Sequence, residues 1–179
     1  QWIHTFGSTN KDFGNFITFD PSGNICVFGV FRENVDFDPG PDIFMLSTSY
    51  HEGFFLKLTP DGDFISVQKL SGQNPNSAVF DSMGNMYLTG VFYTFGMGSG
   101  ADLDPGVGQS FFTSQGGGDV YISKFDSLGN FLWAQAFGSC STDSGGGVRL
   151  SPSEEYVYIG GTVGGSSWVT SEYSPWIDL

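Results

Sequence analysis

The sequence repeats itself, and this repeat limits the possible folds more than any other feature. The stretch FDPSGNICVFGVF at 19–31 matches FDSMGNMYLTGVF at 80–92 and, more weakly, LSPSEEYVYIGGT at 150–162. In the same way, FFLKLTPDGDF at 54–64 matches YISKFDSLGNF at 121–131. A period of about 60 to 70 residues is typical of a chain built from copies of one supersecondary unit.

Each unit is punctuated by a short segment with one plan: Asp or Thr first, Gly fourth, and Asn or Asp fifth. These segments are 20–24, 59–63, 81–85 and 126–130. The first residue suits a cap and the glycine suits a positive φ, so each segment predicts a type I turn followed by a left-handed glycine, and hence a β-hairpin. A fifth segment has Glu154 in place of the glycine, which predicts a degenerate repeat or a different turn.

The runs between these turns predict an all-β fold. They are rich in Phe, Tyr, Val, Ile and Leu, and no segment has apolar residues at helical spacing. The second unit contains four such runs, which are NSAVFDS, NMYLTGVF, DVYISKF and NFLWAQAF. The run GFFLKL is apolar on both faces except at Lys57, which suits a sheet packed between two others. Four-stranded antiparallel units repeated radially are the blades of a β-propeller.

The strand order predicts an incomplete propeller. We expect residues 1–8 to be the closing strand of a preceding blade, 13–72 and 75–139 to be blades, and 146–179 to be an incomplete or degenerate blade with two strands. A closed propeller has about four to eight blades. Three explanations remain: a piece of a longer protein, which we favour, a ring closed by other copies, or an open array covered by a partner.

Composition excludes several classes of function. With 19 acidic and 6 basic residues the formal net charge is −13, which repels phosphate backbones and argues against nucleic acid as a partner. No apolar run is long enough to span a bilayer, so we expect no direct membrane insertion. Since Gln1-Trp2 does not begin a signal peptide, we expect a mature chain or one cut from something longer.

The two cysteines allow two interpretations. Cys26 lies in the apolar run NICVFGVF, and Cys140 lies in a loop of small residues. A buried thiol at Cys26 is the favoured interpretation, and a Cys26–Cys140 disulfide is the alternative.

A second recurring motif is Asp-x-Asp-Pro-Gly, in the connection between the second and third strands of each unit. Two carboxylates two residues apart can hold a hard cation such as calcium, with loop carbonyls completing the shell. Alternatively, Asp-Pro-Gly makes a tight turn, and the Asp side chains cap backbone amides without any metal. We expect Phe37 and Leu103 to anchor the two loops in the core. The candidate calcium ligands are Asp36, Asp38 and Asp42 in one loop and Asp102 and Asp104 in the other.

These motifs together resemble the family named for seven-bladed β-propeller repeats, which occurs in large secreted and surface proteins of Bacteroidetes and neighbouring bacteria. The resemblance covers about residues 1–163, but the segment VGGSSWVTSEYSPWIDL lacks the motifs. It implies an extracellular or outer cell surface location and export as a type IX secretion cargo. Ser82 and Ser127 lie in Asp-Ser-apolar triplets that resemble the O-glycosylation sequon of Bacteroidetes, although Asp-Ser also simply suits a type I turn.

The leading functional hypothesis is therefore a non-catalytic module of a bacterial surface or secreted protein. Its role would be structural, adhesive or protein-interacting, and its partners would be other parts of a longer surface protein or a cell-surface complex. The alternative is glycan binding through Trp168, Tyr173 and Trp176, whose rings could equally be ordinary core. A polysaccharide-degrading enzyme is the weakest alternative, because the two histidines and five glutamates are scattered and we identify no catalytic residues.

Overall fold

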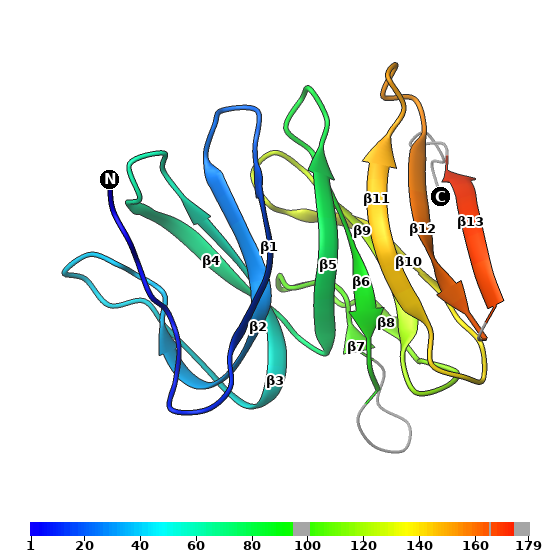
Figure 1. Ribbon diagram of the computed structural model, residues 1–179, viewed down its shortest axis with the longest axis horizontal. Coiled ribbons are helices and arrows are strands. Elements are labelled where there is room, and N and C mark those ends of the chain that lie inside the picture. The colour runs from blue at the N-terminus through cyan, green and yellow to red at the C-terminus, as the bar shows by residue number, and fades with distance from the viewer. Residues whose placement is uncertain (95–100, 165, 174–179) are drawn as a thin grey trace.

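The computed structural model describes the backbone of residues 1–94, 101–164 and 166–173, and side chains through residue 164. Within these residues the chain is all β, in three antiparallel sheets arranged one after another (Figure 1). Accordingly, the described part contains no helix that could cross a membrane. The all-β class and the four-stranded antiparallel sheets predicted from the sequence are confirmed, whereas no closed propeller is found in the described chain.

The three sheets follow the repeat. The N-terminal sheet contains β1 (Phe13–Phe19), β2 (Ile25–Asp36), β3 (Met45–Leu58) and β4 (Phe64–Leu70). The central sheet contains β5 (Gln73–Phe80), β6 (Met86–Phe92), β9 (Asp119–Phe125) and β10 (Phe131–Phe137). The C-terminal sheet contains β11 (Ser144–Leu150), β12 (Val157–Val163) and β13 (Ser166–Tyr173), and a separate pair is formed by β7 (Ala101–Asp102) and β8 (Phe111–Phe112).

Each sheet is a meander, in which strands that follow one another along the chain are hydrogen-bonded neighbours. In the central sheet β9 follows β6, because β7 and β8 form their separate pair. The first strand of the central sheet, β5, contacts both β1 and β11, so the first strands of the three sheets are neighbours (Figure 1). Strand register repeats as well, because Val27 lies opposite Ile17 and Leu88 lies opposite Ala78 at the equivalent position. The repeat in the sequence therefore corresponds to a repeat in how the strands pair, residue by residue.

The four predicted turns are confirmed in detail. In each one the fourth residue donates its N–H to the carbonyl of the first residue at 2.9 to 3.0 Å, and the glycine has a φ of 83 to 93°. The first side chain then accepts further N–H groups; Oδ1 of Asp20, for example, accepts those of Ser22 and Asn24 at 2.9 Å. An Asx cap and a left-handed glycine together explain why these five residues reverse the chain.

The fifth turn keeps the same plan with a non-glycine residue. Glu154 has a φ of 57° and donates its N–H to the carbonyl of Ser151 at 2.9 Å. The turn closes one residue later than the others, through a bond from Ser151 N–H to the carbonyl of Tyr156 at 2.8 Å. The repeat is therefore modified here rather than lost.

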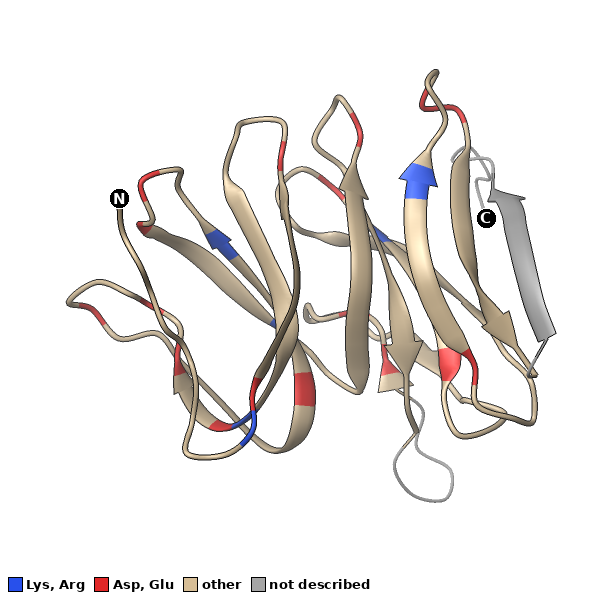
Figure 2. Ribbon diagram, in the orientation of Figure 1, with Lys and Arg blue, Asp and Glu red and all other residues tan. Residues whose placement is uncertain are grey.

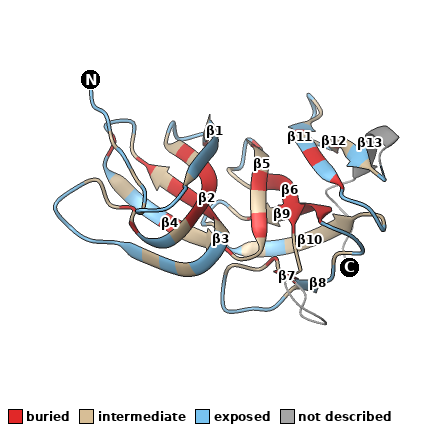
Figure 3. Ribbon diagram, turned by 60° about the horizontal axis from the view of Figure 1, so that its bottom comes forward, coloured by how far each residue is buried: buried red, intermediate tan, exposed pale blue. Residues whose placement is uncertain are grey.

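Apolar side chains fill both spaces between sheets, so the middle strands β6 and β9 of the central sheet are buried on both faces, whereas β10 is only partly buried (Figure 3). Phe28 and Phe55 of the N-terminal sheet pack with Leu88 of the central sheet in one cluster. Tyr87 of the central sheet packs with Val148 of the C-terminal sheet in the other. This arrangement explains why the predicted strands are apolar on both faces.

Cys26 belongs to the first of these clusters and is fully buried, whereas Cys140 is exposed. Both thiols are free, which excludes the Cys26–Cys140 disulfide. Burial raises the pKa of Cys26 to about 12, so this thiol stays protonated at neutral pH.

A second link between sheets was not predicted from the sequence. Asn15 and Asn76 lie at equivalent bulges of the first strands β1 and β5. Nδ2 of Asn15 donates to the carbonyl of Pro75 at 2.7 Å, and Nδ2 of Asn76 donates to the carbonyl of Gly145 at 2.6 Å. The equivalent amide therefore bonds β1 to β5 and β5 to β11. In β11 the bulge position is Gly146, which lacks this donor.

The C-terminal sheet corrects the expectation of two strands after the second repeat. It contains a third strand, β13, which pairs with β12 along its length. The sequence concealed this strand because the segment lacks the Asp-x-Asp-Pro-Gly loop and the lysine that mark the third strand elsewhere. Only the short connection 164–165 separates β12 from β13, so no long loop signals the change of direction.

Residues 1–8, predicted as the closing strand of a preceding blade, form no strand in the described structure. They lie against the N-terminal sheet: the rings of Trp2 and His4 stack at 4.7 Å beside Gly62, and the ring of Phe6 lies 6.0 Å from that of Phe37. A strand requires a hydrogen-bonded neighbour, and no described strand pairs with this segment.

The turn glycines give a direct test of this fold. We expect Gly84→Val and Gly129→Val each to lower the free energy of unfolding by about 1 to 3 kcal/mol, because a β-branched residue resists a φ of 85°. Gly147→Val is the control, since Gly147 lies in a strand with space around the position of an added Cβ. Thermal or urea unfolding measures the difference, and unchanged melting of both turn variants would contradict the turn assignment.

Candidate functional site

The first Asp-x-Asp-Pro-Gly loop is held by its own carboxylates. Oδ1 of Asp36 accepts the N–H of Asp38 at 3.1 Å and that of Phe44 at 2.9 Å. Oδ1 of Asp38 accepts the N–H of Gly40 at 2.7 Å. Phe37 is almost fully buried between them, as predicted. The motif thus closes the connection from β2 to β3 over a buried aromatic anchor.

The second loop repeats every one of these contacts. Oδ1 of Asp102 accepts the N–H of Asp104 at 3.1 Å and that of Ser110 at 2.8 Å. Oδ1 of Asp104 accepts the N–H of Gly106 at 2.7 Å, and Leu103 is fully buried. Two loops with different flanking sequences therefore share one internal bonding scheme.

This scheme bears on the predicted calcium sites. The described residues contain no group of three or more His, Cys, Asp or Glu side chains that could hold a metal ion, and the acidic residues are spread over strands as well as loops and turns (Figure 2). Asp42 is exposed, and at its counterpart Gly108 a side chain would collide with the carboxylate of Asp104. One oxygen of each loop-forming carboxylate already serves backbone N–H groups, which favours the turn interpretation. Calcium binding stays a prediction.

Ser82 and Ser127, the predicted glycan attachment points, both lie exposed at hairpin tips. The hydroxyl of Ser82 donates to Oε2 of Glu154 at 2.7 Å, and its N–H donates to both oxygens of that carboxylate at 3.0 Å. These bonds lower the pKa of Glu154. The left-handed Glu154 thus links the turn of the C-terminal sheet to that of the central sheet. Glycosylation stays a prediction at both serines.

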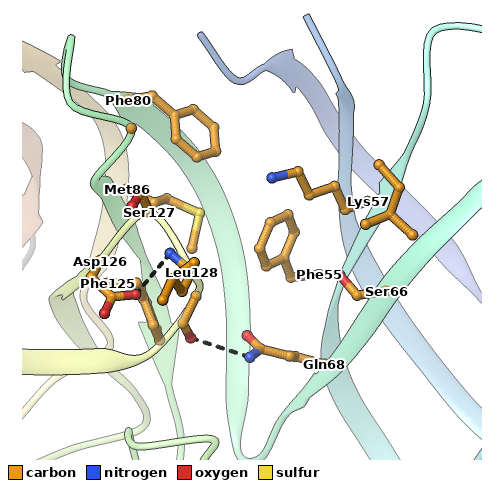
Figure 4. Close-up of a pocket in the computed structure, with 13 residues that line it drawn as sticks. Phe55, Lys57, Ser66, Gln68, Phe80, Met86, Phe125, Asp126, Ser127 and Leu128 are labelled. Carbon is orange, nitrogen blue, oxygen red and sulfur yellow. Dashed lines mark hydrogen bonds between the residues drawn. The ribbon is translucent and has the colours of Figure 1, made fainter. Parts of the chain in front are cut away.

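A cavity of about 320 Å³ opens between the N-terminal and central sheets (Figure 4). Its walls combine aromatic rings with a few polar groups, a usual form of small-molecule site. At one end Nε2 of Gln68 donates to the carbonyl of Gly129 at 3.2 Å, which joins β4 to a turn of the central sheet. The lining includes Phe55, Lys57, Gln68, Phe80, Phe125 and Asp126.

Lys57 and Lys124 recur at one position of the third strand but differ in what they contact. Nζ of Lys57 lies 2.6 Å from Oδ2 of the buried Asp20. Burial alone would raise the pKa of Asp20, but the bonds from Lys57 and Asn24 outweigh it and hold this pKa below its ordinary value. Lys124 instead lies over the ring of Tyr87 at 4.9 Å, a cation–π contact.

The sequence also carries a repeated Gly-Ser-x-x-x-Asp motif whose structural role was not predicted. It occurs at 7–12 and 138–143. In the first copy the N–H of Ser8 donates to Oδ2 of Asp12 at 2.6 Å. In the second copy the N–H of Ser139 donates to Oδ2 of Asp143, also at 2.6 Å. Comparison of the two segments would have revealed this cap, which precedes the first strand of a sheet in both places.

Asp119 and Asp143 form a pair of buried carboxylates with opposite properties. Oδ2 of Asp119 accepts the N–H of Gln115, but its buried Oδ1 has no hydrogen-bond partner in the described structure. Burial raises the pKa of Asp119, and the charge of Asp143 adds to this effect. Burial acts in the same direction on Asp143, but bonds from Gly164 and Ser139 outweigh it, so the pKa of Asp143 is lowered. Asp119 therefore holds a proton more tightly than Asp143.

No protein-family model matches the sequence, and no curated protein matches it. The resemblance to propeller repeats therefore depends on the quoted motifs alone. The side chains of Trp168, Tyr173 and Trp176, predicted as sugar-stacking candidates, lie outside the described residues.

Paired substitutions separate the turn from the calcium interpretation. Asp36→Asn and Asp102→Asn keep the acceptor oxygen, so we expect each to lower the free energy of unfolding by less than about 1 kcal/mol. Asp36→Ala and Asp102→Ala lose two N–H bonds each, for an expected cost of about 1 to 3 kcal/mol. Thermal unfolding is measured with calcium chloride and with a chelator. A calcium-dependent melting temperature that the Asn variants abolish would establish a metal site instead.

The buried carboxylates predict pH effects of opposite sign. Folding raises the pKa of Asp119, so this group lowers the free energy of unfolding once the pH rises above its pKa in the unfolded chain. Asp119→Asn removes the ionisable group and should therefore stabilise the protein at pH 7. Folding lowers the pKa of Asp143, so this group contributes to stability at pH values above its pKa in the unfolded chain. That contribution is lost as the pH falls through its pKa in the folded chain. Asp143→Asn should therefore cost about 1 to 3 kcal/mol at pH 7.

Melting temperatures of both variants and the parent, measured from pH 3 to pH 7, test this assignment. Both differences should shrink as the pH falls toward 3, because Asp119 is then protonated in the folded and the unfolded chain alike and the unfolded chain increasingly binds a proton at Asp143. Destabilisation by Asp119→Asn at pH 7 would show that its charge is compensated by a contact the assignment omits.

Proposed function

We propose that this chain is a non-catalytic β-propeller module of a bacterial surface or secreted protein, with a structural or protein-interaction role outside the cell. Its partners would be other parts of a surface protein or a cell-surface complex. The resemblance of the repeat motifs and the acidic composition support this proposal.

The observation that carries the proposal is the use of the recurring carboxylates. Those of Asp20, Asp81 and Asp126 cap their own turns. Those of Asp36 and Asp102 close the long loops in the same manner. Side chains that recur in order to hold backbone in place are typical of a scaffold, since catalysis requires polar groups that converge on one reacting centre.

Variation between the repeats supports an interaction role. The connection from β2 to β3 and the connection from β6 to β9 share the Asp-x-Asp-Pro-Gly core but differ in the residues around it. The sheets that carry them have equivalent register. Variable loops on a constant scaffold are a common way to present binding surfaces.

A second candidate function is glycan binding, favoured by the cavity of Figure 4. Rings of Phe55 and Phe80 line it together with Lys57 and Gln68. Aromatic faces with neighbouring hydrogen-bonding groups suit a sugar ring. Phe80 is part of the apolar packing between sheets, which is the ordinary explanation for its position.

Surface location and glycan binding can be tested together. In the source cells, an antibody against this chain should label intact cells, and external protease should remove the label. On a glycan array the purified chain should show no selective binding. Labelling that appears only after lysis would contradict the surface role.

The same material distinguishes the alternatives. Selective glycan binding that is lost in Phe80→Ala, with Phe111→Ala as a folded control at an exposed ring, would make the cavity a sugar site. Turnover on a panel of polysaccharides that is lost in Asp126→Asn would make the protein an enzyme.

A further inference from the structure

The segments that lead into the first strands of the three sheets differ in length. The connection from β10 to β11 covers residues 138–143, and the segment 7–12 before β1 has the same Gly-Ser-x-x-x-Asp cap. The connection from β4 to β5 consists of residues 71 and 72 alone. The junction between the N-terminal and central sheets is therefore built without the cap.

Without the cap, the start of the third strand is uncovered at this junction. His51 is the counterpart of Gly118, because the residues that follow them, Glu52 and Asp119, pair with the second strand at the same position. Gly118 is buried and forms a parallel bridge with Thr142 of the cap. His51 is exposed. The short connection thus leaves open a place that the cap fills one sheet later.

A cavity of about 490 Å³ lies at this junction. Its size, and its combination of rings with a few polar groups, are usual for a small-molecule site. The described residues that line it include no Lys, Arg, Asp or Glu, which favours an uncharged occupant. The lining includes Phe13, Asn15, Val30, His51, Gln73 and Tyr93.

Gln73 occupies the position that aspartates occupy before the other two first strands. Asp12 and Asp143 each accept three hydrogen bonds there. Gln73 is only 2% exposed, and neither atom of its amide has a hydrogen-bond partner in the described structure. The N–H of Gly72 is instead bonded to the carboxylate of Glu52. A buried amide without a partner lowers stability, so stability does not explain this side chain.

We propose that this cavity binds an uncharged ligand that carries an apolar group and an amide, and that Gln73 recognises the amide. The apolar group lies among the rings of the cavity wall. A change of side-chain torsion turns the amide of Gln73 into the cavity that this residue lines. Its Nε2 then donates to the carbonyl of the ligand, and its Oε1 accepts the ligand N–H. The two amides pair through two hydrogen bonds.

Two sources offer this chemistry, a segment of a partner polypeptide and a free small molecule. The first source deepens the protein-interaction role and rests on the proposed function. The amide site itself does not depend on that role, because its walls and Gln73 act on either source in the same way.

Titration with N-acetylphenylalanine amide, followed by NMR of the side-chain amides, tests the proposal. We expect saturable binding with a dissociation constant of about 1 mM, which is usual for so small a ligand, and a shift of the Gln73 amide signals. N-acetylphenylalanine has a carboxylate and phenylalanine amide has an ammonium group. Each should bind about fivefold more weakly or worse, because its charge loses hydration without a partner in the cavity.

Variants identify the cavity. Gln73→Leu should weaken binding by about tenfold and leave the melting temperature unchanged or higher, because it removes a buried amide that has no partner. Gln115→Leu, the same substitution at an exposed glutamine outside the lining, should change neither property. His51→Ala removes part of one wall at an exposed position and should weaken binding by about threefold.

The lack of saturable binding by the folded wild-type chain overturns the proposal. Tighter binding of the ammonium probe overturns it as well, because the carboxylate of Glu52 would then select the ligand. A Gln73→Leu variant that binds like the parent, or that loses stability, shows that the amide does not recognise the ligand and has the same consequence. Unchanged binding by His51→Ala likewise excludes this cavity.

A longer probe distinguishes the two sources. The uncharged tripeptide acetyl-glycyl-phenylalanyl-glycine amide should bind about tenfold more tightly than the single amino acid if the source is a polypeptide. Equal binding supports a free small molecule in the same site. None of these titrations bears on surface labelling of the source cells, so failure here is separate from failure of the proposed function.

Discussion

Burial of the middle strands β6 and β9 of the central sheet on both faces is the constraint on which the rest of this structure depends. Its strands carry apolar side chains to both sides, and removal of that surface from water is the main favourable term in folding. Phe28 and Phe55 cover one face, and Val148 and Ile159 cover the other. A single four-stranded sheet of this composition could not bury its own apolar surface. Stability is therefore a property of neighbouring sheets, as in other repeat proteins.

Sequence reasoning succeeded where the deciding interactions are local. The turn at Asp20 is specified by residues within four positions of each other, so its cap and its left-handed Gly23 could be predicted from five letters. It failed where distant partners decide. Glu154 adopts a positive φ with its carboxylate bonded to Ser82, which is 72 positions away. Strand β13 likewise depends on pairing with β12 rather than on a marker of its own.

The candidate site shows the same division. The sequence could place Asp36 and Asp102 in equivalent loops and anchor them through buried neighbours, because spacing and apolarity are local properties. It could not decide between a calcium site and a metal-free turn. These alternatives differ only in whether the carboxylate oxygens bind a cation or accept backbone N–H groups. The raised pKa of Asp119 depends on a burial that no neighbour in sequence reveals. The cap of Asp143 left a visible signal in the repeated Gly-Ser-x-x-x-Asp, which comparison of the two copies would have found.

The distribution of side-chain size indicates how such sheets are arranged relative to one another. Where first strands meet, the contacting residues are small or polar, such as Asn15 with Pro75 and Asn76 with Gly145. Toward the fourth strand the space is filled by large rings, such as Trp133. The contacts between neighbouring sheets therefore change in kind across the interface, from amide hydrogen bonds to backbone carbonyls at the first strands to packing of apolar rings toward the fourth strand.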